Sequence, residues 1–559
     1  MSTLDWWVLA GTLLAIVAYG AWKTRGAQTA ESYLRGGHDS RWYTIGLSIM
    51  ATQASAITFL SMPGQAYEDG LGFVQFYFGL PIAMVILSAT IVPLYYRLKV
   101  YTAYEYLESR FDLKTRLLTA FLFLLQRGLA AGLSIYAPSI ILSTMLGWSL
   151  TWTTLAMGLV VVAYTVSGGT RAVSYTQTSQ MAVMLGGMAL AAAFVIWRLP
   201  AGVSLGEAVG VAGALGKMKA VDFSARFDTR YTLWSGLGGG LFVALAYFGT
   251  DQSQVQRYLS GASLRESRMG LLFNGLVKVP MQFLILFVGI LVFAYYQFNR
   301  PPLVFNEVEA AHARTVQPAS WQALDTAYEA AAGAKDAQVR AWLEASRSGG
   351  RDAVAAARGE LVAADARVRA LREDAKKLVA QASPRGEPND ADYIFLSFVL
   401  HHFPSGLVGL LVAVILCAAM SATASALNAL GTTTVIDFYK RLHRPDASDR
   451  HYLVAAQGFT IFWGLVAIAF AALASHLDNL IQAVNVLGSL FYGPMLGVFL
   501  VGFFIKRVGG TAAFWATGVA QAVVLVIFAV SKVSFLWYNV IGCGVLVAVA
   551  VGLNAAIEK

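Results

Sequence analysis

The sequence predicts an all-α polytopic membrane protein with about thirteen transmembrane helices. Hydrophobic residues make up 57% of its 559 residues and charged residues only 13%, whereas a soluble domain carries about one-quarter charged residues. Apolar runs long enough to cross a bilayer recur along the chain, with short polar loops between them. One long segment, 299–395, is instead rich in Ala, Arg, Glu and Asp.

The distribution of basic residues predicts the orientation of the helices. Lys and Arg gather in alternate loops, for example Arg97, Lys99 and Arg110 after the third expected span and Lys440 and Arg441 after the ninth. Loops rich in Lys and Arg remain cytoplasmic, so we expect the N-terminus outside and the C-terminus inside a bacterial inner membrane. The net charge of +9 is spread loop by loop, which argues against a nucleic-acid partner.

The stretch Ser48–Gly64 is too polar for a helix that faces lipid, because it carries Thr52, Gln53 and Thr58 among other polar residues. Backbone at membrane depth leaves a helix only where it is buried or lines a cavity. The Pro-Gly pair at 63–64 predicts an interrupted helix that holds a solute or an ion near mid-membrane. A seam of small residues that only packs helices together is the alternative.

A second glycine-interrupted helix is expected over 232–250, where Gly236 and the run 238–240 break its outer half. Each interrupted helix opens a block of five expected spans, over 42–198 and 232–503. This pattern predicts a five-plus-five inverted repeat, in which solute and ion sites lie where the interrupted helices meet.

Two cations are expected at membrane depth. Arg127 follows Arg116 by eleven residues within one apolar run, which places it about 16 Å along the helix. Lys278 lies in another apolar run on a stripe with Asn274 and Gln282. A charge facing lipid is costly, so both should face the bundle interior and, with few carboxylates nearby, meet an anionic solute. A purely structural role for Arg127 is the alternative.

Residues 299–395 predict a helical hairpin outside the membrane. Apolar residues recur at heptad-like spacing in two runs, one on each side of the glycine pair at 349–350. We therefore divide the chain into transmembrane helices 1–8 (1–298), the extracytoplasmic hairpin (299–395) and transmembrane helices 9–13 (396–559). The hairpin is either a tolerated insertion or a surface that binds a protein partner.

Several motifs resemble the sodium:solute symporter family along nearly the whole chain outside 299–395. They are ASAITFLSMPGQAYEDG, YTAYEYLESRF, YAPS after Arg127, SGGTRAV, DQSQVQRYLSG, SATASALN and DFYKR. The branch most similar contains the monocarboxylate, iodide and multivitamin transporters and the bacterial sialic-acid symporters. The resemblance implies the leucine-transporter fold, alternating access and cation coupling.

The resemblance also implies a cation site. Its ligands would be the carbonyls of Ala51, Ala54 and Ala418 and the hydroxyl of Ser421. Gln177 stands in this site where the family has a carboxylate.

Ala422 replaces a second hydroxyl residue that the family carries. Because a hard cation requires several oxygen ligands, these departures predict weak sodium affinity or a different coupling ion. Asp251, where Asn is common in the family, has no explanation at the level of sequence.

The resemblance places a carboxylate-binding arginine at Arg127 and a pocket-closing aromatic residue at Tyr247. The sugar-transporting branch has a carboxylate in its third span, where this chain has Phe76 and its neighbours, which argues against a simple hexose. The expected solute-binding residues are the following: Thr52, Gln53, Thr58, Phe76, Arg127, Tyr247 and Lys278.

The predicted function is a cation-coupled secondary active symporter that imports a small organic solute, a carboxylate anion, by alternating access. Sodium is the expected coupling ion and a proton is the alternative; no cofactor is expected. The chain shows no nucleophile–base pair or phosphate loop, so we predict that it is not an enzyme. A transporter-like sensor whose hairpin binds a partner is the competing function.

Overall fold

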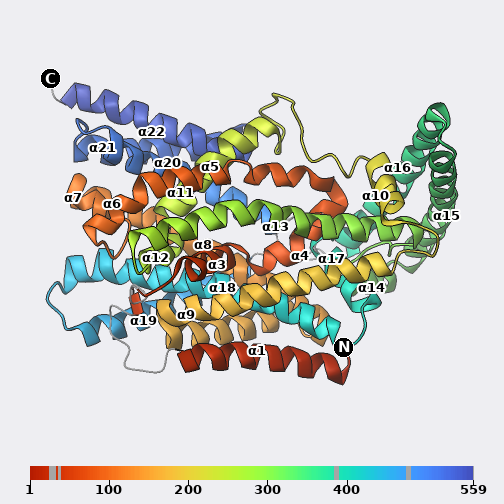
Figure 1. Cartoon of the computed structure of the whole chain (residues 1–559), viewed down its shortest axis with the longest axis horizontal. Helices are drawn as coiled ribbons and strands as arrows, with labels where there is room; N and C mark the ends of the chain where they lie inside the picture. The colour runs from red at the N-terminus through yellow and green to blue at the C-terminus, as the bar shows by residue number, and fades with distance from the viewer. Residues whose placement is uncertain (24–32, 35–38, 383–389, 474–479, 558–559) are drawn as a thin grey trace.

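The computed structural model describes residues 1–23, 33–34, 39–382, 390–473 and 480–557. Long helices run side by side through the body of the molecule, and one pair of helices, α15 and α16, projects from one end (Figure 1). The described residues contain no strand beyond a single bridge between Ser40 and Gly261. The predicted all-α class is confirmed.

The first half of the chain contains α1 (Thr3–Lys23), α3 (Trp42–Gln53), α4 (Ala56–Asp69), η1 (Gly70–Tyr77), α5 (Leu80–Ala89), α6 (Ile91–Leu98), α7 (Glu105–Arg110), α8 (Leu113–Leu146), α9 (Leu150–Trp197), α10 (Leu205–Ala214), η2 (Ser235–Gly239), α11 (Gly240–Thr250), α12 (Gln252–Leu259) and α13 (Leu264–Phe298). The second half contains α14 (Glu307–Val316), α15 (Pro318–Ser348), α16 (Arg351–Ala382), α17 (Ala391–His402), α18 (Leu407–Thr433), η3 (Thr434–His443), α19 (Asp449–Ala471), α20 (Leu480–Phe504), α21 (Gly510–Val530) and α22 (Phe535–Ile557).

Nine helices in the described residues are long and apolar enough to cross a membrane. Shorter apolar helices include Thr3–Ile16, Leu150–Val166 and Ser235–Thr250. The 48-residue α9 is kinked at Gly169, whose φ of 61° is not helical. The predicted count of about thirteen spans stays a prediction.

The first interrupted helix breaks earlier than the sequence predicts. Helix α3 ends at Gln53, and Ala54 and Ser55 leave the helical region before α4 begins. Pro63 instead lies inside α4. A side chain on Gly289 of α13 would meet the Pro63 carbonyl oxygen at 2.1 Å, and one on Gly64 would meet the Ala391 carbonyl oxygen at 1.9 Å. The predicted break at 63–64 is therefore wrong: here Pro63 and Gly64 serve close helix packing.

The break in the second interrupted helix also lies at a different position from the glycine run. The run forms the π-helical turn η2, and the break falls at Asp251 between α11 and α12. Side chains on Gly236 and Gly240 would meet the carbonyl oxygens of Gln75 and Phe76 at 2.0 and 2.5 Å. These glycines allow η2 to lie against η1, so the prediction that they break the helix is wrong.

Helices α15 and α16 form the predicted hairpin, joined at Gly349, whose φ of 79° is readily adopted only by glycine. The apolar stripe is buried, with Trp321 and Tyr328 on α15 and Val368 and Leu378 on α16 in one cluster. The pair forms the projecting end of the molecule in Figure 1. The hairpin thus has a small core of its own.

A buried ionic cluster joins the hairpin to the membrane helices. Arg372 of α16 donates to Asp390 at 3.0 Å and to Glu68, near the end of α4, at 3.2 Å. Lys376 contacts Asp390 at 3.1 Å. The guanidinium also lies over the ring of Phe305, 4.8 Å from its centre. The hairpin is therefore anchored on the outer half of the first interrupted helix.

The two chain ends mark opposite ends of the helical body. Figure 1 shows the N-terminus at the end that carries the hairpin and the C-terminus at the other. This arrangement agrees with the predicted placement of the N-terminus and the hairpin on one side and the C-terminus on the other. The absolute orientation in a membrane stays a prediction.

Candidate functional site

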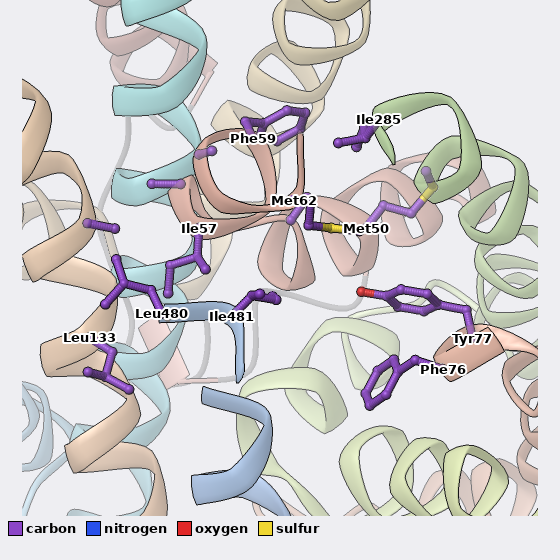
Figure 2. Packing of buried hydrophobic residues seen from close by; sticks show 14 of the residues in the cluster. Met50, Ile57, Phe59, Met62, Phe76, Tyr77, Leu133, Ile285, Leu480 and Ile481 are labelled. Atoms are coloured by element: carbon purple, nitrogen blue, oxygen red, sulfur yellow. The ribbon is translucent and has the colours of Figure 1, made fainter. Parts of the chain in front are cut away.

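A cavity of about 110 Å³ lies where the two interrupted helices meet. Its walls come from α3, α4, η1, α5, α8, α11 and α20. Figure 2 shows Ile57 of α4 close to Ile481 of α20, and both line the cavity. The lining residues are the following: Gln53, Ser55, Ile57, Thr58, Phe76, Tyr77, Leu80, Gln126, Arg127, Gly240, Val243, Ala244, Tyr247, Phe248, Ile481, Val484, Asn485, Gly488 and Tyr492.

Arg127 forms an ion pair with Asp251 in the wall of this cavity. The same guanidinium donates to the hydroxyl of Tyr492 at 3.0 Å, and that hydroxyl donates to Asp251 at 3.0 Å. The ring of Tyr247 lies 5.3 Å from the guanidinium carbon. The prediction that Arg127 lacks a carboxylate partner is wrong, because the break before α12 brings Asp251 to it.

Asp251 also begins α12. Its second carboxylate oxygen accepts from the backbone N–H and the hydroxyl of Ser253, at 2.9 and 2.6 Å. A carboxylate at a helix N-terminus satisfies backbone donors that the helix leaves open. Asp251 therefore has two roles. It neutralises the charge of Arg127, and it caps the N-terminus of α12, where the helix resumes after the break.

Four polar atoms of cavity-lining residues have no hydrogen-bond partner. They are the side-chain oxygens of Gln53 and Gln126, Nε of Arg127 and Nδ2 of Asn485. Buried polar atoms without partners are costly. These four atoms are buried within the wall of the cavity, so the residues around the cavity carry donors and acceptors that the described residues leave without partners.

Two of the expected cation ligands, Ala51 and Ser421, meet between α3 and α18. The hydroxyl of Ser421 donates to the carbonyl oxygen of Ala51 at 3.1 Å. Ala54 and Ala418 are buried as well. Within the described residues no group of three or more His, Cys, Asp or Glu could hold a metal ion, so carbonyls and hydroxyls are the ligands available for a hard cation there.

The side-chain oxygen of Gln177 is not available as a ligand for a cation between α3 and α18. Its nitrogen donates to the hydroxyls of Thr52 and Ser425 at 3.1 and 2.7 Å and to the carbonyl oxygen of Ser421 at 3.3 Å. Its oxygen accepts from Ser48. An amide nitrogen carries no lone pair for a cation. The predicted role of Gln177 as a cation ligand is therefore wrong in this conformation.

Five of the seven expected solute-binding residues line the cavity: Gln53, Thr58, Phe76, Arg127 and Tyr247. Thr52 does not, because its hydroxyl bonds to Gln177 and Ser425. Lys278 lies on α13, fully buried, and its ammonium has no hydrogen-bond partner among the described residues. The structure therefore separates Lys278 from the cavity that it was expected to share with Arg127.

Sequence reasoning missed Tyr492, Asn485 and Asp251. The one available signal for Asp251 was its unusual residue type at a family position. Tyr492 and Asn485 lie on α20, an apolar helix more than 350 residues after Arg127. Asn485 is one of the few polar residues of this helix, but nothing in the local pattern places either residue beside Arg127.

The sodium:solute symporter family model matches residues 33–318 and 380–519. The chain belongs to the sodium:solute symporter family. The stretch of 319–379 between the two matched parts covers most of α15 and α16, so most of the hairpin lies outside the match to the family model. The family is one of transporters, which confirms the prediction that the protein is not an enzyme.

Two relatives illustrate the range of the similarity. The symporter is 28% identical over 506 residues to human sodium-coupled monocarboxylate transporter 1, which covers 90% of this chain and 69% of the relative. It is 25% identical over 554 residues to the sodium/sialic acid symporter of Proteus mirabilis, covering 96% and 92% of the two chains.

A solved structure resembles the symporter's fold. It is the substrate-bound outward-open state of a Na⁺-coupled sialic acid symporter, with a TM-score of 0.76, 22% identity and coverage of 99% of this chain and 98% of that one. This likeness confirms the predicted leucine-transporter-type architecture. The protein is thus an integral membrane transporter.

Proposed function

We propose that the symporter couples the entry of sodium to the import of a small carboxylate anion by alternating access. The proposed location is a bacterial inner membrane, with the N-terminus and hairpin outside and the C-terminus in the cytoplasm. The single observation that carries the substrate class is the guanidinium of Arg127 in the cavity wall, whose Nε has no partner.

The geometry of Arg127 supports a carboxylate. One edge of its guanidinium holds Asp251 and Tyr492. The Nε atom has no partner among the described residues, and a guanidinium binds planar oxyanions through pairs of its N–H groups. The names of the relatives, a monocarboxylate transporter and a sialic acid symporter, agree with a substrate that carries one carboxylate.

The lining of the cavity supports a small organic solute. The cavity, of about 110 Å³, is enclosed by both polar and apolar side chains. Phe76 and Val243 provide apolar walls. We therefore favour a small monocarboxylate with a hydroxyl or keto group that meets Gln53 or Asn485.

A neutral, hydroxyl-bearing solute is the second candidate. The Arg127–Asp251 pair is already compensated, so the cavity has no uncancelled charge that requires an anion. The unpartnered oxygens of Gln53 and Gln126 would accept from hydroxyl groups. A panel of solutes therefore has to include neutral molecules of the same size.

Sodium is the proposed coupling ion because two oxygen atoms, the Ala51 carbonyl oxygen and the Ser421 hydroxyl oxygen, lie 3.1 Å apart at the α3–α18 contact. Hard cations such as sodium bind to oxygen ligands of this kind. A proton stays as the alternative. The partner proposed for the hairpin is less well supported, because the stripe of α15 and α16 is already buried within the hairpin. The sensor function has no observation in its favour.

Uptake into proteoliposomes tests the proposal. Purified protein is reconstituted, and labelled lactate is offered with an inward sodium gradient, with an inward proton gradient, or with neither. We expect accumulation that requires sodium and is inhibited by other short monocarboxylates but not by glycerol. Inhibition by glycerol and not by propionate would favour the neutral solute, and accumulation driven by protons alone would overturn sodium coupling.

A further inference from the structure

Two clusters of oxygen atoms lie side by side where α3, α9 and α18 meet. The first contains the carbonyl oxygen of Ala51 and the hydroxyl of Ser421. The second contains the hydroxyls of Thr52 and Ser425 and the carbonyl oxygen of Ser421. Ser421 belongs to both, through its side chain in the first and its backbone in the second.

The amide nitrogen of Gln177 fills the second cluster. It donates to all three oxygens at 2.7–3.3 Å, and the hydroxyls of Thr52 and Ser425 are themselves 3.1 Å apart. The amide oxygen is fixed by Ser48. A cation could use these oxygens only after displacing the amide, which would leave its two N–H donors buried without acceptors.

The buried charge of Arg257 also disfavours a cation in the second cluster. Arg257 of α12 is fully buried, and its Nη1 donates to the hydroxyl of Ser174 at 3.0 Å and to the Thr170 carbonyl oxygen at 3.3 Å. Its Nε and Nη2 have no partner, and none of the described carboxylates pairs with it. Ser174 lies three positions before Gln177 on α9, which is about one helical turn. A fixed positive charge near the second cluster opposes the binding of another cation.

We propose that Gln177 replaces an ion in the second cluster, so that the symporter binds one cation per solute, at Ala51 and Ser421. The inference rests on the proposed sodium coupling and adds its stoichiometry. One sodium ion carried with one monocarboxylate moves no net charge. Uptake of a monocarboxylate is therefore electroneutral, and the membrane potential does not drive it.

Equilibrium binding of ²²Na⁺ to the purified protein without solute counts the sites directly. We expect one sodium ion per chain and a Hill coefficient of 1. The variant Gln177→Asp replaces the amide with a carboxylate that offers oxygen ligands and offsets Arg257, and we expect it to bind two. Gln180→Asp, one turn further along α9 and equally buried, is the matched control and should bind one.

The transport arm uses potassium and valinomycin to impose a membrane potential on proteoliposomes. Lactate uptake by the wild type should not change with potential, whereas uptake by Gln177→Asp should increase when the interior is negative. Two sodium ions per wild-type chain, or a Gln177→Asp protein that still binds one, would overturn the inference. Binding of one sodium ion with no uptake of any carboxylate would overturn the proposed substrate and leave the single site standing.

Discussion

Asp251 interrupts the second broken helix and also neutralises Arg127, so one side chain links the backbone break to the charge of the cavity. Its carboxylate is completely buried, and its two oxygens are shared between Arg127 and Tyr492 on one side and Ser253 on the other. The break can move relative to α8 only if this ion pair changes.

The first prediction concerns how much the Arg127–Asp251 ion pair stabilises the protein. We expect Asp251→Asn to lower the free energy of unfolding by about 3–5 kcal/mol, because it leaves a buried guanidinium without its carboxylate. Thermal unfolding of the purified protein in detergent measures the loss. The double variant Arg127→Gln with Asp251→Asn should be less damaged than the sum of the single variants, and strictly additive losses would contradict the coupling.

The second prediction concerns the geometry of the guanidinium. Arg127→Lys keeps the charge and loses the planar fork, so lactate binding should weaken by about 1–3 kcal/mol, or roughly five- to 150-fold. Binding is measured by the protection that lactate gives against thermal unfolding. Arg226→Lys, a change in an exposed pair with Asp228, is the control. Unchanged lactate affinity in the Arg127→Lys protein would remove the carboxylate hypothesis.

A third prediction tests the anchor of the hairpin. Arg372→Ala removes the guanidinium between Asp390 and Glu68 and should destabilise the protein by about 3–5 kcal/mol. Limited proteolysis should then cut the hairpin faster. Lys377→Ala, which breaks an exposed pair with Asp374 on the same helix, should cost less than about 1 kcal/mol. Equal sensitivity of the two variants would argue against the anchor.

The same anchor predicts an acid dependence. Burial by itself would raise the pKa of Asp390, but the charges of Arg372 and Lys376 hold that pKa below its ordinary value. A carboxyl group whose pKa is lowered by folding stabilises the protein fully above its unfolded pKa of about 4, and the contribution is lost as the pH falls through the folded pKa. The wild-type midpoint of thermal unfolding should therefore fall on acidification below about pH 4, and Asp390→Asn should reduce this dependence. An identical profile in both proteins would contradict it.

The fifth prediction tests sidedness. Ser348, exposed at the tip of the hairpin, should be labelled in intact cells by a membrane-impermeant thiol reagent after Ser348→Cys. The native cysteines, Cys417 and Cys543, are both buried and provide the unlabelled background. Labelling that appears only after the cells are broken would reverse the proposed orientation.

The sequence by itself determined the class, the helical body and the hairpin. Apolar runs and heptad spacing are local patterns, and burial of apolar surface in a membrane or in a small helical core follows from them directly. The polar stretch around Thr52 and Thr58 predicted that a site lies beside the first interrupted helix, and the cavity lies there. Arg127, on the separate helix α8, was expected in the same site from its depth in the membrane and from the family resemblance.

Only the tertiary structure decided which polar groups meet. Asp251 lies 124 positions from Arg127, and Gln177 lies 125 positions from Thr52 and 248 from Ser425. No local pattern specifies such partners, because they depend on how α8, α9, α12 and α18 pack. For the same reason the breaks fell at Ala54 and Asp251, and the prolines and glycines expected to cause them became contact points between helices.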